Sequence, residues 1–149
     1  MERIPDTSDF VKEAKLSLNF LSRCVDKLRG CRPYFEVRFE DNHTIALHTW
    51  ADFGDITGRW IDAFILARII CGSQKGMKVE LRLRKLLLSY FNEENGLSYR
   101  PKPARKYKQE IVERVYDEHI AEGFDQSKTL RGLCTWYEYT KEKKTKEYL

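Results

Sequence analysis

Residues 48–63 read His-Thr-Trp-Ala-Asp-Phe-Gly-Asp-Ile-Thr-Gly-Arg-Trp-Ile-Asp-Ala, and this stretch decides the fold. It crowds acids, aromatic residues and glycines around the start of a helix, which we expect to run from Asp55 to Cys71. Because apolar residues cover most sides of that helix, we expect it to be buried on most sides. The sequence therefore predicts a buried helix whose N-terminal end is a candidate ligand site.

The segments on either side of this helix also show apolar residues at helical spacing. A first helix should begin after Thr7 or Ser8, either of which is a suitable N-cap, and continue to Gly30. The next helix should form an antiparallel hairpin with the central one, because Gly72–Gly76 separates the two. The apolar patterns outside the central helix predict helices over residues 7–30, 77–92, 107–121, 125–139 and from 143 onward.

A short extended segment interrupts this helical pattern. Residues Tyr34–Phe39 alternate between apolar and polar, and Glu40–Asn42 suits a turn. We expect at most a small β-hairpin near residues 34–48. The sequence thus predicts an all-α, mainly helical fold built from antiparallel helical hairpins, with residues 1–149 forming a single helical domain.

Length and composition limit the class of protein. The chain has 149 residues, of which 42% are hydrophobic and 34% charged, enough for one domain with a core. Its longest apolar stretch, Ile61–Cys71, contains Asp62 and Arg68 and is shorter than the roughly 20 residues of a membrane span. The first residues contain acids and a proline where an export signal would be basic and then apolar. We therefore expect no membrane partner and a cytoplasmic location.

Charge and cysteine content argue against two further classes of site. The formal net charge is +4, and the basic runs at residues 100–108 and 141–146 lack interleaved aromatic residues, so we expect no nucleic-acid partner. The four cysteines show no C-x-x-C spacing and share no helix-face spacing with the three histidines. We expect reduced, mostly buried thiols, no metal site and no cofactor.

The central helix carries the candidate catalytic groups at its start. Asp55, Arg59 and Asp62 stand at i, i+4 and i+7, so an arginine lies between two carboxylates on one face. Mutual ion pairing would explain this trio without a substrate, and Asp52 or Asp55 could equally cap the helix. The functional interpretation is that a carboxylate works as general acid or base. On that interpretation Asp52 and Asp55 are the catalytic candidates.

Aromatic residues near these acids could stack on sugar rings. Trp50 and Tyr99 are the better candidates because they fall on predicted loops with polar neighbours, whereas Trp60 and Trp136 stand at helical spacing and should be packed. His48 could donate a proton or bond to a backbone carbonyl, and we favour the second. The candidate substrate-binding residues are His48, Trp50, Arg59, Tyr99 and Arg100.

Three stretches resemble one family. The run Trp50–Ala63, with its Asp-x-x-Gly-Arg-Trp-x-x-Ala core, is similar to helix starts in six-hairpin, (α/α)6-toroid glycosidases. Residues 94–101 resemble the loop between helices of that family, and residues 130–140 resemble a hairpin helix that runs into a Thr-Gly-Asp turn. This chain departs from the pattern there, with Lys141-Glu142-Lys143. The resemblance implies the N-terminal portion of a toroid, which this chain is too short to complete.

Two functions follow as expectations. The resemblance implies a carbohydrate-active fragment with a possible oligosaccharide partner, whose complete active site would need residues beyond this chain. The alternative is a non-catalytic helical binding or scaffold module. Because each hairpin of a helical array buries its apolar side against the next, an incomplete array leaves a face uncovered. Both readings therefore predict a homo-oligomer.

Overall fold

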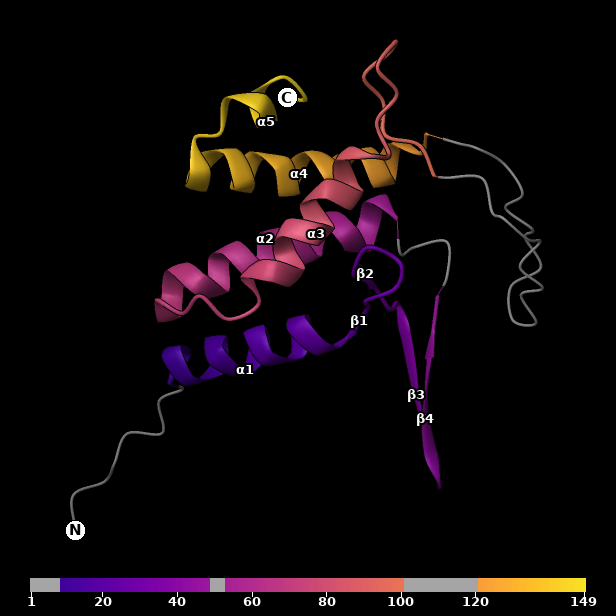
Figure 1. Ribbon diagram of the computed structural model, residues 1–149, viewed down its shortest axis with the longest axis vertical. Helices are drawn as coiled ribbons and strands as arrows, with labels where there is room; N and C mark the ends of the chain where they lie inside the picture. Colours follow the sequence, from indigo (N-terminus) through magenta and orange to yellow (C-terminus); the bar gives the residue numbers. More distant parts are fainter. Residues whose placement is uncertain (1–8, 49–52, 101–120) are drawn as a thin grey trace.

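A computed structural model of the chain describes residues 9–48, 53–100 and 121–149. In Figure 1, α2 lies between α1 and α4, α3 passes beside α2, and the β3–β4 hairpin extends away from the helices. The elements in chain order are α1 (Phe10–Arg23), β1 (Val25–Asp26), β2 (Arg32–Pro33), β3 (Glu36–Glu40), β4 (His43–Leu47), α2 (Gly54–Cys71), α3 (Met77–Leu88), α4 (Gly123–Thr140) and α5 (Lys143–Lys146).

Helix α1 begins with a side-chain cap. The carboxylate of Asp9 accepts a hydrogen bond from the amide of Lys12 at 3.0 Å, which satisfies one of the free N–H groups of the first turn. Asp9 is therefore the N-cap. The predicted caps, Thr7 and Ser8, lie outside the described residues.

Helix α1 ends earlier than the apolar pattern predicts. It stops at Arg23 instead of continuing to Gly30, because the next residues form a small antiparallel ladder in which Val25 pairs with Pro33. The turn that joins β1 to β2 is closed by Gly30 and Cys31, both with positive φ. A left-handed backbone at two successive residues reverses the chain and cannot continue a helix.

The predicted small hairpin is present, but the predicted fold class is wrong. Strands β3 and β4 pair from Glu36↔Leu47 to Glu40↔His43 around a two-residue turn. Helices make up 56% of the described residues, and the two antiparallel hairpins make the chain a small mixed α/β domain, not a partial toroid. A toroid stacks successive helical hairpins, whereas α2 packs mainly against α4 and α1 and less against its neighbour α3.

The central helix α2 lies close to its prediction. It begins at Gly54, one residue before the expected start, and ends at Cys71, where Gly72 adopts a left-handed conformation with φ of 65°. Ile61, Phe64 and Ile65 are fully buried, as the apolar pattern predicts. Its last turn is more exposed than expected, because no other described helix covers Ile69 and Ile70.

Glycines allow α2 and α4 to approach closely. A Cβ atom on Gly58 would lie 2.3 Å from the carbonyl oxygen of Lys128, and one on Gly132 would lie 2.6 Å from the carbonyl oxygen of Gly58. Real Cβ atoms do not come this near to backbone, so only glycine fits at these two positions. One turn away, the hydroxyl of Thr129 lies 3.5 Å from the carbonyl oxygen of Gly54.

The hydrophobic core forms where α1, α3 and α4 meet α2. Trp60 and Trp136 are packed as predicted, and the indole N–H of Trp60 donates to the carbonyl of Leu21 at 3.2 Å. The fully buried apolar residues of this core are Leu18, Ile61, Phe64, Ile65, Leu83, Leu87 and Leu133.

The C-terminal half agrees in part with the sequence prediction. Helix α3 ends at Leu88, before the expected Asn92, and a short loop then places Phe91 opposite Ser98. Helices α4 and α5 lie where helices were expected. The helix predicted over residues 107–121 lies almost wholly outside the described residues. No helix within the described part of the chain is long and apolar enough to cross a membrane.

Candidate functional site

The structure brings Asp55 and Arg100 beside the same carboxylate, Asp125, whereas His48 pairs with Asp26. Trp50 and Asp52 lie outside the described residues. The described members of the predicted site are His48, Asp55, Arg59, Tyr99 and Arg100.

His48 binds a carboxylate in the first hairpin. Its Nε2 atom lies 3.1 Å from Oδ2 of Asp26, and its ring stacks on Tyr34 with ring centroids 4.6 Å apart. Burial raises the pKa of Asp26, but hydrogen bonds from His48 and from the amide of Leu28 outweigh it and hold the pKa below its ordinary value. His48 thus joins the end of β4 to β1.

Asp55 and Arg59 form the local ion pair that their spacing predicts. Arg59 Nε lies 2.7 Å from Asp55 Oδ1, and the guanidinium stands 5.7 Å from the ring centroid of Phe124. Burial raises the pKa of Asp55, Arg59 lowers it and the nearby Asp125 raises it, with a net upward shift. A carboxyl group that is protonated more easily than usual is a feature of general acids.

The third member of the predicted trio has other partners. Asp62 accepts a hydrogen bond from Arg131 Nε at 2.8 Å and from the hydroxyl of Thr135 at 2.7 Å, both on α4. The side chain of Arg59 is 48% exposed, so Arg59 pairs with Asp55 at the surface and is not enclosed between the two acids. Because solvent screens such a pair, removing Arg59 should cost less than breaking a buried pair.

Arg100 is held inside the protein. Its Nε lies 2.6 Å from Asp125 Oδ2, and it also pairs with Glu122, so it fixes the loop after α3 to the start of α4. The neighbouring Tyr99 accepts a hydrogen bond from the side-chain amide of Asn95 at 3.0 Å. Arg100 is thus buried and ion-paired where the loop after α3 meets the start of α4.

A second cluster of buried charged residues was not predicted from the sequence. Glu80 on α3 is fully buried and pairs with Arg84 on the same helix and with Arg68 on α2. Arg84 also lies over the ring of Trp136, and burial lowers its pKa to about 10. The sequence pattern could have indicated this burial. Glu80 and Arg84 lie on the same face of α3 as the buried Leu83 and Leu87, because the four residues stand at i, i+3, i+4 and i+7.

The cysteines offer little chemistry. All four are free, and Cys31 is buried, whereas Cys134 is exposed although its apolar surroundings in the sequence predicted burial. Burial raises the pKa of the Cys24 thiol, which disfavours the nucleophilic thiolate. Nowhere in the three described ranges do three His, Cys, Asp or Glu side chains gather as metal ligands.

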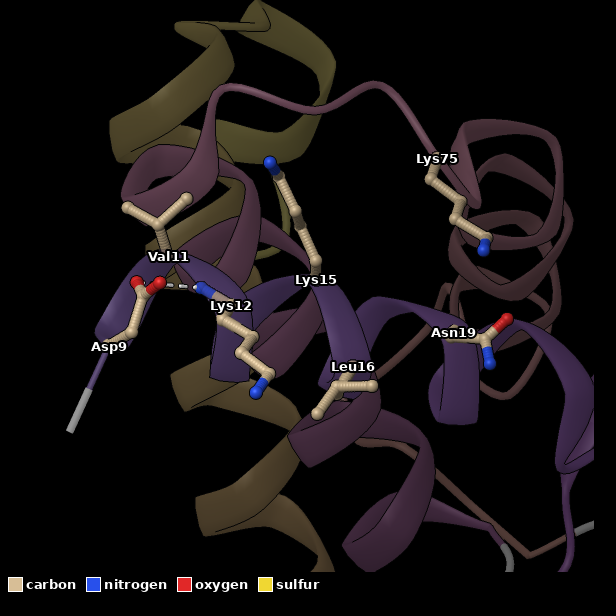
Figure 2. Close-up of a pocket in the computed structure, with 7 residues that line it drawn as sticks. All are labelled: Asp9, Val11, Lys12, Lys15, Leu16, Asn19 and Lys75. Atoms are coloured by element: carbon tan, nitrogen blue, oxygen red, sulfur yellow. Dashed lines mark hydrogen bonds between the residues drawn. The ribbon is translucent and has the colours of Figure 1, made fainter.

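Two adjacent hollows run along α1. One, of about 410 Å³, lies between α1 and the β3–β4 hairpin and is lined by Leu16, Asn19, Phe20, Arg23, Cys24, Tyr34, Val37 and Ala46. The other, of about 390 Å³, lies between α1 and the loop before α3 and is lined by Asp9, Val11, Lys12, Lys15, Leu16, Asn19 and Lys75 (Figure 2). Leu16 and Asn19 line both hollows, so the two form one continuous surface, here called the α1 surface.

The α1 surface exposes large apolar side chains. Leu16 is 54% exposed and Phe20 is 56% exposed, although Phe20 also contacts Trp60. Exposed apolar side chains that gather in one place mark interaction sites. The sequence held the signal: Leu16 and Phe20, at i and i+4, form a second apolar stripe beside the core-facing Ala14 and Leu18.

Comparisons with protein-family models, with curated proteins and with solved structures found no match to this chain.

Proposed function

We propose that this chain is a non-catalytic binding module that associates with a second copy of itself through the α1 surface. The observation that carries the proposal is the exposure of Leu16 and Phe20 at the hollow between α1 and the β3–β4 hairpin. This region is concave and mainly apolar, since Tyr34, Val37 and Ala46 complete its wall. Such a surface gains free energy when another protein surface excludes water from it.

The charged groups favour binding over catalysis. Of the predicted site residues, the catalytic candidate Asp55 is paired with Arg59, and the substrate-binding candidate Arg100 is enclosed by Asp125 and Glu122. The residues of the α1 surface instead combine apolar side chains with lysines and an asparagine. This is the composition of an interaction surface, with an apolar centre and a polar rim.

The first prediction concerns Leu16, which lines both hollows. We expect the purified chain to form dimers at micromolar concentration and Leu16→Ser to weaken association about tenfold or more, because burying a leucine contributes roughly 1.5–3 kcal/mol. The measurement is sedimentation velocity over a concentration series. Ile69→Ser is the matched control, because Ile69 is similarly exposed but lies on α2 away from the α1 surface.

Two outcomes of this experiment would contradict the proposal in different ways. A wild-type chain that stays monomeric at every concentration contradicts the proposal. Equal weakening by Leu16→Ser and Ile69→Ser would contradict the assignment to the α1 surface.

A second candidate function is oligosaccharide binding beside Asp55. It is favoured by the half-exposed Arg59 guanidinium, which lies against Phe124, and by the raised pKa of the neighbouring carboxyl group. Titration calorimetry with oligosaccharides tests it: binding that Phe124→Ala abolishes supports this function, and no heat from any glycan removes it.

A further inference from the structure

The β3–β4 hairpin presents an apolar side chain next to acids. Phe39 is 85% exposed near the end of β3, and Glu40 and Asp41 follow it at the turn. Glu40 lies 3.4 Å from the exposed His43. Because the hairpin extends away from the helices, this tip is free of the rest of the described chain (Figure 1).

The hollow of Figure 2 has the complementary character. Lys12 and Lys15 project from α1, and Lys75 comes from the loop before α3. Among the residues that the structure describes, no carboxylate forms an ion pair with these three ammonium groups; the carboxylate of Asp9 caps the helix instead. The half-exposed Leu16 supplies an apolar wall.

We infer that the hairpin tip of one copy docks in the lysine-rimmed hollow of a second copy, with Phe39 against Leu16 and with Glu40 and Asp41 facing Lys12 and Lys15. This rests on the proposed self-association and names the contact that makes it. The hollow, of about 390 Å³, has room for a phenylalanine side chain. Opposite charges at its rim fix the orientation of the partner.

The occupant must come from another copy. The hollow lies along the N-terminal part of α1, whereas the hairpin leaves the body beyond the opposite end of that helix (Figure 1). A tip therefore does not reach the hollow of its own chain. If the hairpin tip of each copy docks in the hollow of the other, the two copies form a closed two-fold symmetric dimer with two equivalent contacts.

Charge reversal in trans tests this docking. The tip variant is Glu40→Lys with Asp41→Lys, and the hollow variant is Lys12→Glu with Lys15→Glu. In a homodimer of either variant, side chains of like charge face each other at both contacts. The self-association of each variant should therefore weaken roughly tenfold or more. Mixed in equal amounts, the two variants restore opposite charges at both contacts, and we expect heterodimers as stable as the wild-type dimer.

The readout is sedimentation velocity with one variant fluorescently labelled, after far-ultraviolet dichroism has established that both variants fold. Glu93→Lys with Glu94→Lys is the control, because it reverses two acids in the loop after α3 and should leave association unchanged. Variants that each dimerise like the wild type, or a mixture that forms no heterodimer, overturn the docking. If Leu16→Ser still dissociates the dimer in that case, the proposed function stands without this contact, whereas a monomeric wild type removes both.

Discussion

At the scale of single residues, the pair His48 and Asp26 holds the first hairpin to the end of β4. The carboxylate is largely buried and accepts from the imidazole and from the amide of Leu28. Hydrogen bonds to a charged group typically contribute about 1.5–3 kcal/mol to stability. The depressed pKa of Asp26 shows that the folded state favours the ionised form.

This pair makes stability depend on pH. Because the folded pKa of Asp26 lies below its ordinary value of 3.8, its contribution is present above that pH and is lost as the pH falls through the folded pKa. We expect Asp26→Asn to lower the free energy of unfolding by about 1–3 kcal/mol at pH 7, with the deficit shrinking below pH 3.8. Urea unfolding at a series of pH values measures it.

Glu93→Gln provides the control for this series, since Glu93 is an exposed residue of the loop after α3 and lies outside the proposed dimer contact. A deficit for Asp26→Asn that stays constant down to pH 2 would show that its carboxylate charge does not stabilise the fold.

At the scale of elements, the close contact between α2 and α4 depends on Gly58 and Gly132. Each glycine lets one helix approach the backbone of the other, and the added Cβ would have nowhere to go without moving a carbonyl group. Helices that approach this closely are held by many short van der Waals contacts. A single methyl group added at either glycine should therefore disturb packing across the whole interface between α2 and α4.

We expect Gly58→Ala to lower the free energy of unfolding by roughly 1–3 kcal/mol, the usual cost of overpacking, despite the better helix propensity of alanine. Gly123→Ala is the matched control: it lies in α4, and its Cβ would meet nothing within 4 Å. Urea denaturation should show Gly123→Ala neutral or more stable by up to about 1 kcal/mol. A stable Gly58→Ala would contradict the close approach of the two helices.

Local patterns predicted the described helices and the β3–β4 hairpin, but not the β1–β2 ladder that ends α1 early. Helix α2 was placed within one residue, and the Asp55–Arg59 pair follows from i, i+4 spacing. The partner of Asp62 could not be predicted, because Arg131 lies 69 residues away on a helix whose position depends on packing. For the same reason the pairing of Arg100 with Asp125, next to Asp55, could not be predicted from the sequence.

At the scale of the whole molecule, α2 lies between α1 and α4, while Leu16 and Phe20 of α1 remain about half exposed to solvent. The hairpin adds Phe39 on a projecting arm. A small domain with this much exposed apolar surface gains stability when a second copy covers it, since binding to the folded state alone shifts the folding equilibrium.

Thermal unfolding should therefore depend on protein concentration. For a dimer that dissociates as it unfolds, we expect the Tm to rise by about 2 °C for each tenfold increase in concentration, given the usual unfolding entropy per residue. Differential scanning calorimetry checks this. The Tm of Leu16→Ser should stay constant up to higher concentrations than that of the wild type, because its association is weaker. A concentration-independent Tm for the wild type would count against association.

The contact between α2 and α4 also has a kinetic consequence. The contact between α2 and α4 joins residues that are 75 positions apart in the sequence, such as Gly54 and Thr129. The chain must therefore close a long loop before this contact forms. Closing such a loop costs entropy before packing compensates for it, which slows folding relative to a bundle of neighbouring helices. We therefore expect the rate at which this protein reaches its native state to depend on how soon Gly132 of α4 meets Gly58 of α2.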